Sequence, residues 1–300
     1  MMLFVATALA GSGPWLLGPG DQSVYTGVEV QRLTRLHVVT DGDGGDTVID
    51  VGEGLSTFGV KGIVTYGLLA RTELEIEVPW YRVQANRRDA QVCIDLGPNS
   101  CATTQSVGLL QVRAEGLLLD ELAGSPISLS LGTHLRYGGF TAPTRKRITN
   151  VGEGTTDLGL VLSAGRSGGL GAGYWLAYVE GGWTYRFPTT DSYPSNQVAP
   201  LPEWTVTGEA LLAPDLRFAL GPSATWVYRD GLDWYELDLA DPDRFAALGV
   251  QNLRVGGKVI IRNDTNVAFS VGALRTVYAQ NNPTDAWIIN AGLSAQGLRR

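Results

Sequence analysis

The sequence predicts an all-β fold, a transmembrane antiparallel β-barrel of about twelve strands. Three observations predict it. The 300 residues include 39 Gly, 8 Trp and 11 Tyr, whereas only 18% are charged. Apolar and polar side chains alternate with a period of two within the extended segments. Short turns and long polar connections also alternate strictly along the chain, as in barrels with short periplasmic turns and long extracellular loops.

Composition excludes two other classes of protein. The mean hydropathy is +0.03, and no segment after the first ten residues offers the 18 or more apolar residues that a spanning helix needs. The formal net charge of −7 argues against nucleic acid as a partner, because a nucleic-acid-binding surface must be basic. No cofactor is expected.

Residues 1–10 form a short apolar run that ends in Ala8-Leu9-Ala10. This pattern predicts a signal peptide cleaved after Ala10, although no Lys or Arg precedes the run. The alternative is a buried N-terminal strand or helix. Residues 11–300 show no linker or change in composition, so we expect a single barrel domain.

The two cysteines, Cys93 and Cys101, lie in a turn-rich segment of what we expect to be an exported protein. They predict a local disulfide, with a pair of free thiols as the alternative. A zinc site is disfavoured because no His or Cys cluster lies nearby. Asp41, Asp43 and Asp46 resemble the start of a calcium loop, but Gly52 occupies the position of the required Glu, so no metal is expected.

The alternation of turns and loops places the expected strands. They cover residues 22–35, 56–68, 72–82, 105–119, 127–140, 155–165, 170–187, 204–212, 216–229, 251–262, 265–279 and 286–298. Short turns are expected at residues 69–71, 122–126, 166–169, 213–215 and 263–264. If every short turn lies inside the cell envelope, the strand number is even and both termini are periplasmic.

The period of two separates a lipid face from a lumen face. Leu74, Ile76 and Val78 face one side of their strand, and Glu73, Glu75 and Glu77 face the other. The apolar set is expected to face lipid, because a charge at the bilayer midplane costs about 2–4 kcal/mol. The side chains expected to line the lumen are Glu29, Lys61, Glu73, Glu75, Glu77, Arg113, Glu115, His134, Arg136, Asp157, Arg254 and Lys258.

Neither sign of charge dominates this lining, so the sequence predicts no strong ion selectivity. A structural network of paired charges that fills a narrow lumen is the alternative interpretation for each residue. Two positions fit the alternation poorly. Pro222 within a strand predicts a bulge or kink, and Arg275 faces lipid unless the register shifts or its side chain reaches the rim.

Aromatic residues concentrate at two levels, which predicts girdles at the two membrane interfaces. The outer girdle is expected to contain Phe58, Trp80, Tyr137, Trp183, Tyr185, Trp204, Trp226, Tyr228 and Trp287. The inner one is expected to contain Tyr66, Trp175, Phe218 and Phe269.

Two stretches resemble a known group. Gly13-Pro-Trp-Leu-Leu-Gly-Pro-Gly20, and the segment from Gly62 to Pro79 with Tyr66-Gly-Leu-Leu-Ala-Arg71-Thr-Glu-Leu, resemble the outer-membrane proteins of the phenol-degradation "MetA-pathway" family. That group is broadly similar to the channels for long-chain fatty acids and aromatic hydrocarbons. The resemblance implies transport of small molecules, apolar ones among them.

We therefore expect an outer-membrane channel or transporter of a Gram-negative bacterium, with a narrow, charge-lined lumen and no catalytic residue. Its expected partners are outer-membrane lipids, lipopolysaccharide, an unidentified small solute and the barrel-assembly machinery. One alternative is a non-transporting structural or surface-interaction barrel. A less favoured one is a lipid-modifying enzyme with a Ser/His pair, for which His37 and His134 are the available histidines.

Overall fold

The computed structural model describes residues 13–39, 46–85, 101–138, 155–188, 202–215, 217–231, 249–263, 266–283 and 285–297. The strands are β1 (Gln22–Val39), β2 (Asp46–Leu69), β3 (Thr72–Ala85), β4 (Thr104–Val107), β5 (Leu110–Leu119), β6 (Ser128–Tyr137), β7 (Thr155–Leu170), β8 (Gly173–Pro188), β9 (Glu203–Ala213), β10 (Phe218–Arg229), β11 (Val250–Arg262), β12 (Val267–Gln280), β13 (Asn282–Pro283) and β14 (Trp287–Gly297). A short 3₁₀ helix, η2 (Glu121–Ala123), lies between β5 and β6. Among the described residues, no helix is long and apolar enough to cross a membrane.

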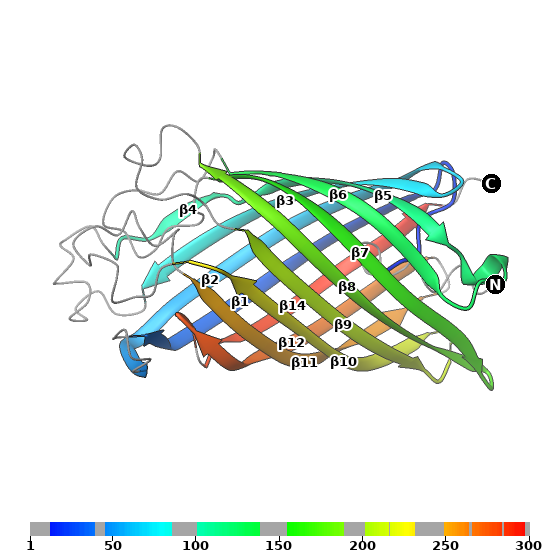
Figure 1. Ribbon diagram of the computed structural model, residues 1–300. Coiled ribbons are helices and arrows are strands. Elements are labelled where there is room, and N and C mark those ends of the chain that lie inside the picture. Colours follow the sequence, from blue (N-terminus) through cyan, green and yellow to red (C-terminus); the bar gives the residue numbers. More distant parts are fainter. Residues whose placement is uncertain are drawn as a thin grey trace.

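The strands close into an antiparallel barrel (Figure 1). β1 pairs with β2 on one side and with β14 on the other, which joins the two ends of the sheet. β4 and β13 only extend the rim, through pairing with β3 and β1, and leave twelve strands in the ring. The predicted all-β fold and strand number are confirmed. Closure leaves no unpaired sheet edge, as lipid requires.

The connections β2–β3, β5–β6, β7–β8, β9–β10 and β11–β12 lie at one end of the barrel, together with the first residue of β1 and the last of β14 (Figure 1). Gln22 pairs with Gly297 at this end, and the remaining connections, which include the longest, start from the strand ends at the other. We call the two the short-turn end and the long-connection end. One predicted turn, residues 166–169, is wrong: β7 continues to Leu170, and the chain turns at Gly171, whose φ is +59°. Glycine adopts this φ without steric cost.

Two further differences from the expected strands are larger than a few residues at one end. β2 begins at Asp46 instead of Ser56, because a register shift at Leu33/Arg35 lets the hairpin with β1 continue to Val39. The expected strand 105–119 is divided into β4 and β5. Between them Gly108 packs under the ring of Tyr81, where a larger residue would collide.

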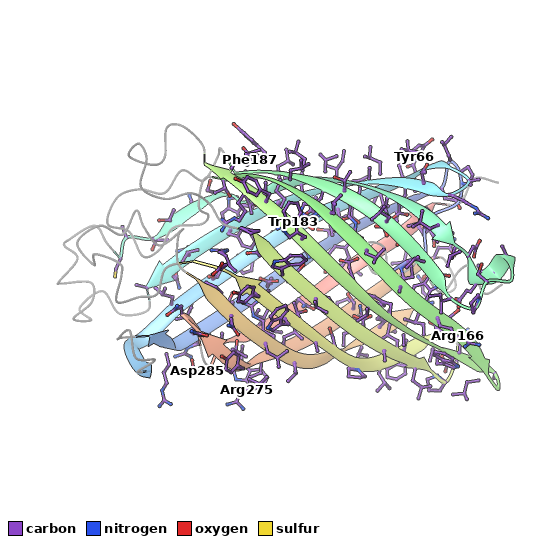
Figure 2. The ribbon with its side chains drawn as sticks, in the orientation of Figure 1. Tyr66, Arg166, Trp183, Phe187, Arg275 and Asp285 are labelled. Atoms are coloured by element: carbon purple, nitrogen blue, oxygen red, sulfur yellow. The ribbon has the colours of Figure 1, made fainter. Side chains whose placement is uncertain are left out.

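The outer surface of the barrel is apolar, with large side chains such as Leu131, Leu160 and Ile289 about half exposed. Aromatic rings cluster toward the long-connection end. Phe58 and Trp80 have centroids 6.4 Å apart, and Tyr185 and Phe187 are 4.7 Å apart. Figure 2 shows Trp183 and Phe187 toward this end and Tyr66 near the other. Phe58, Trp80, Trp183 and Tyr185 thus gather toward the end where the outer girdle is expected.

The two positions that fit the alternation poorly, Pro222 and Arg275, are accommodated in different ways. The β9–β10 ladder omits Gly221 and Pro222 but resumes in the same register at Ser223, so no bulge occurs there. The interruption follows from the missing N–H of proline. Arg275 does face outward, and its guanidinium lies 5.5 Å from the ring centroid of Trp287.

Candidate functional site

The barrel encloses a cavity of about 760 Å³. The predicted residues that line it are Glu29, Lys61, Glu75, Glu77, Arg113, His134, Arg136, Asp157 and Lys258. Glu73, Glu115 and Arg254 are not among the residues that line this cavity: Glu73 and Glu115 are buried, and Arg254 lies close enough to Glu29 for an electrostatic interaction. The structure thus brings most of the predicted residues into one chamber, because the period of two turns them all inward.

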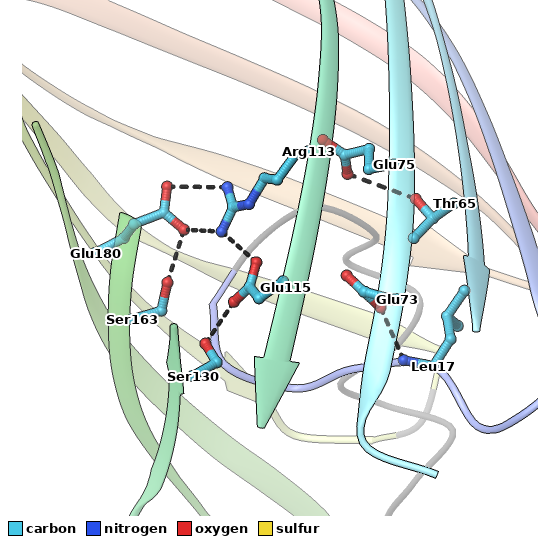
Figure 3. Close-up of polar contacts among 9 residues, drawn as sticks. All are labelled: Leu17, Thr65, Glu73, Glu75, Arg113, Glu115, Ser130, Ser163 and Glu180. Carbon is cyan, nitrogen blue, oxygen red and sulfur yellow. Dashed lines mark hydrogen bonds and ion pairs between the residues drawn. The ribbon is translucent and has the colours of Figure 1, made fainter. Parts of the chain in front are cut away.

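A buried charge cluster lies around Arg113 (Figure 3). Arg113 donates to both carboxylate oxygens of Glu180, at 3.3 and 2.8 Å, and its Nη2 lies 2.5 Å from Glu115 Oε2. Ser163 donates to Glu180 at 2.8 Å, and Ser130 donates to Glu115. We call these five residues the Arg113 cluster. Because Arg113 is on β5 and Glu180 is on β8, the ion pair reaches past two strands and narrows the lumen.

His134 takes a structural position on the same wall. Its ring lies over Gly159, where any Cβ would collide with it, and its Nε2 is 3.1 Å from Thr184 Oγ1. The contact therefore joins β6 to β8 across β7. His134 is buried inside the barrel rather than exposed at the lipid face. The side chain of His37 lies outside the described residues.

A second set of ion pairs lies nearer the long connections. Glu203 accepts from Arg229 at 2.9 Å and lies 3.8 Å from Arg136, which donates to Gln111 at 2.8 Å. Asp157 lies 3.8 Å from Arg186. Lys258 and Glu209 form a further pair at 2.8 Å on β11 and β9. Much of the basic lining is therefore neutralised locally.

Three carboxylates on the wall opposite this second set of ion pairs differ from it because they have no ion-pair partner among the described residues. Glu29 on β1 and Glu75 and Glu77 on β3 line the cavity but form no ion pair with a described residue. Glu75 accepts from Thr65 at 3.5 Å. The nearby Lys61 lies over the ring of Tyr25, 5.8 Å from its centroid. We call Glu29, Glu75 and Glu77 the acidic wall.

The chain before β1 enters the barrel at the short-turn end. Trp15 Nε1 donates to Glu121 at 3.0 Å, and the Trp15 ring meets the inward Tyr178 edge-on at 6.1 Å. Leu17, only 3% exposed, donates its backbone N–H to Glu73 at 2.9 Å. Figure 3 shows this contact beside the Arg113 cluster. We call residues 13–21 the N-terminal segment.

Local packing fixes the path of this segment. Gly20 donates to the Gly67 carbonyl at 2.7 Å, and the Gly67 N–H donates to Asp21 at 3.0 Å. A Cβ on Gly67 would collide with the Gly18 carbonyl, so this close approach needs glycine. Trp15 also packs against a buried apolar group on the inner wall that consists of Tyr174, Leu176, Tyr178, Leu211, Ala213, Ala219, Ile260 and Ala268.

Sequence reasoning did not assign Trp15, Leu17, Glu121 or Tyr178 to the site. One signal was available: Trp15-Leu-Leu is apolar, flanked by Gly and Pro, and lies outside any alternating strand. Such a stretch must bury its apolar side chains somewhere other than the lipid face. The inward run of apolar residues on β8 is the complementary signal.

In the part of the chain that the structure describes, no three His, Cys, Asp or Glu side chains gather as a metal site would require. Cys101 is buried, but Cys93 lies outside the described residues, so the disulfide stays a prediction. Residues 1–10 also lie outside them, so the signal peptide stays a prediction as well.

A closed antiparallel barrel with an apolar outside and a charged inside has the architecture of membrane-spanning β-barrels. The chain is similar in fold to the COG4313 outer membrane channel from Pseudomonas putida F1, with a TM-score of 0.66 and 15% identity over 94% of this chain and 97% of that one. The KdgM porin in complex with disordered oligogalacturonate has a TM-score of 0.48 at 10% identity, covering 92% and 99%. The NanC porin has a TM-score of 0.47 at 9% identity, covering 89% and 98%.

No family model matches the chain, and no curated protein matches it. The resemblance to the MetA-pathway family therefore stays a prediction. What the comparison with the Pseudomonas putida channel shows is the fold: a barrel of the same architecture along almost the whole of both chains.

Proposed function

We propose that the protein is an outer-membrane channel for small, predominantly polar molecules. The observation that supports this most directly is the cavity of about 760 Å³ inside a closed barrel, lined by charged and polar side chains. Barrels of about eight strands fill their interior with side chains, whereas larger ones enclose ligand cavities or aqueous channels. A twelve-stranded ring with such a chamber belongs with the second kind.

The proposed location is the outer membrane of a Gram-negative bacterium, with the short-turn end and both termini in the periplasm. Short turns on the periplasmic side and long loops outside are the rule for such barrels. The apolar outer surface and the aromatic cluster near the long connections support a lipid environment. In this orientation the chamber lies between the cell exterior and the N-terminal segment.

The N-terminal segment and the Arg113 cluster limit the passage at the periplasmic side. The segment is held by Trp15 and by the buried bond from Leu17 to Glu73. The Arg113 cluster lies next to it, between β5 and β8. The proposed channel is therefore narrow, and solutes that pass must be small and tolerate a charged lining.

Single-channel conductance of the refolded protein in a planar bilayer, under a salt gradient, tests the proposal. We expect small discrete steps, because the lumen is obstructed at one end. We expect weak selectivity for cations, because most lumen bases are paired, whereas the acidic wall is not. Silence from a protein shown to be folded by heat-modifiable gel migration would contradict the proposal.

One observation favours a second candidate, a non-transporting structural or surface-interaction barrel. The N-terminal segment and the ion pairs together could seal the lumen, which would leave function to the long connections. Deletion of residues 13–19 separates the two candidates. A sealed barrel is silent as the wild type and conducts, if at all, only without the segment, whereas a channel conducts as the wild type and conducts more without the segment.

The lipid-modifying enzyme would require a Ser and a His converging at the outer interface. His134 instead contacts Thr184 within the barrel. Absence of lipase activity in both the wild type and His134→Ala would exclude the lipid-modifying enzyme.

A further inference from the structure

Three arginines lie on the outer face of the barrel, toward the long-connection end. Arg32, Arg82 and Arg275 are all exposed. The register places Arg275 of β12 opposite Trp287 of β14, and Trp287 opposite Arg32 of β1. Neighbouring strands are about 4.8 Å apart, so the backbones of Arg275 and Arg32 flank that of Trp287 across about 10 Å. Figure 2 shows Arg275 at this end of the barrel.

Arg82 extends the same surface onto β3. It pairs with Phe58, whereas Arg32 pairs with Ser56 two residues before Phe58 on the same strand. The guanidinium of Arg275 lies 5.5 Å from the ring centroid of Trp287. Phe58 packs edge-on against Trp80 at 6.4 Å. Three cations therefore border the aromatic level of the barrel on one side. We call Arg32, Arg82, Arg275 and Trp287 the arginine patch.

No carboxylate among the described residues forms an ion pair with the patch. The acidic residues of β1, β3, β12 and β14 are Glu29, Glu73, Glu75 and Glu77. All four face the interior, where they line the cavity or, for Glu73, bind Leu17. Within the described chain, none of the three arginines forms an ion pair. Arginines exposed at a membrane interface are attracted to anionic lipid head groups, which can neutralise them from outside the protein.

We propose that the arginine patch binds the phosphate groups of lipid A, the phosphorylated glycolipid of the outer leaflet. The planar guanidinium presents paired N–H donors that match a phosphate bidentately. Trp287 beside them suits the boundary between acyl chains and head groups. The choice of lipid A over a phospholipid rests on the proposed orientation, which places the long-connection end in the outer leaflet.

The test is lipid binding by the full-length refolded protein in neutral detergent, followed by native mass spectrometry. The probes are bisphosphorylated lipid A, chemically dephosphorylated lipid A and phosphatidylglycerol. We expect Arg32→Gln/Arg275→Gln to bind bisphosphorylated lipid A about 30-fold more weakly, since each basic side chain near an anionic lipid surface contributes about fivefold. Arg166→Gln is the matched control, because Arg166 is exposed at the short-turn end (Figure 2).

Arg275→Lys is a second, milder variant. It keeps the positive charge but loses the paired N–H donors of the guanidinium. It is expected to weaken binding by less than Arg275→Gln. Unchanged affinity in the double variant, or equal affinity of wild type for dephosphorylated lipid A, would overturn the proposal. Tighter binding of phosphatidylglycerol than of lipid A would overturn lipid A as the source of the phosphate.

These outcomes are independent of the channel proposal. The patch lies outside the lumen, so the double variant should keep the wild-type conductance. Loss of lipid A binding with conductance intact supports the patch. A folded wild type that never conducts but binds lipid A through these arginines would reject the channel and retain the patch.

Discussion

Arg113 shows how the lumen charges are held. One guanidinium contacts two carboxylates, and each carboxylate also accepts from a serine. The structural network that the sequence left as an alternative is therefore present for this residue. Removing one member of a buried pair is costly because the other charge stays buried without its partner.

Replacing Arg113 by Gln should therefore destabilise the barrel by about 3 kcal/mol, since Glu115 and Glu180 lose their cation. The measurement is the urea midpoint of folding, read from heat-modifiable gel migration. Arg166→Gln, on the outer surface, should change the free energy of unfolding by less than about 0.5 kcal/mol. Equal midpoints for the two variants would contradict a stabilising role for the cluster.

The acidic wall gives a second prediction at this scale. Glu29→Gln/Glu77→Gln removes two lumen charges that form no ion pair with a described base, so the cation preference should fall or reverse. The reversal potential under a salt gradient measures it. Glu209→Gln is a contrasting variant, because it removes the partner of Lys258. It therefore changes selectivity through an unpaired base rather than through the acidic wall. An unchanged reversal potential in Glu29→Gln/Glu77→Gln would show that these carboxylates do not face the ion path.

Among the elements, the N-terminal segment has the clearest functional consequence. Its contacts, chiefly Trp15 to Glu121 and Tyr178 and the Leu17 bond to Glu73, are separate from the strand ladders. A segment outside the ladders opens at lower free energy than the strands themselves. The strands around it are each paired on both sides, so the segment can leave without opening the barrel.

Deletion of residues 13–19 should raise the conductance severalfold without loss of heat-resistant folding. Trp15→Ala should have a smaller effect in the same direction, as more frequent or longer open steps. Trp175→Ala, on the outward face of β8, controls for the loss of an aromatic residue. If the deletion leaves the conductance as it was, the segment does not limit the passage.

The elements also show what sequence could and could not establish. The strand number followed from the alternation of turns and long connections, and the faces followed from the period of two, as for Leu74 and Glu75. Strand boundaries were wrong where tertiary contacts decide them: the β1 register shift that extends β2 to Asp46 leaves no periodic trace in the sequence. Most of the expected lumen residues line the cavity, but their partners were not predicted, because the contact of Arg113 with Glu180 depends on curvature between β5 and β8.

For the whole molecule, closure makes a prediction about chain connectivity. Gln22 and Gly297 are paired neighbours. A circular permutant that links them through a short flexible linker, with new termini between Ala70 and Arg71, should still form a heat-modifiable barrel. New termini between Gly181 and Gly182, inside β8, should abolish it, because they break a strand paired on both sides. Breaks are tolerated at exposed turns and not within a sheet.

The β1–β14 ladder has one more consequence, for biogenesis. The first strand acquires its second neighbour only when the last strand pairs with it, so the sheet has two bare edges until β14 is in place. An unclosed sheet with such edges invites pairing with other chains. Because of the β1–β14 ladder, productive assembly depends on full-length synthesis. A transcript that stops before β14 would yield a polypeptide that a cell must degrade rather than insert.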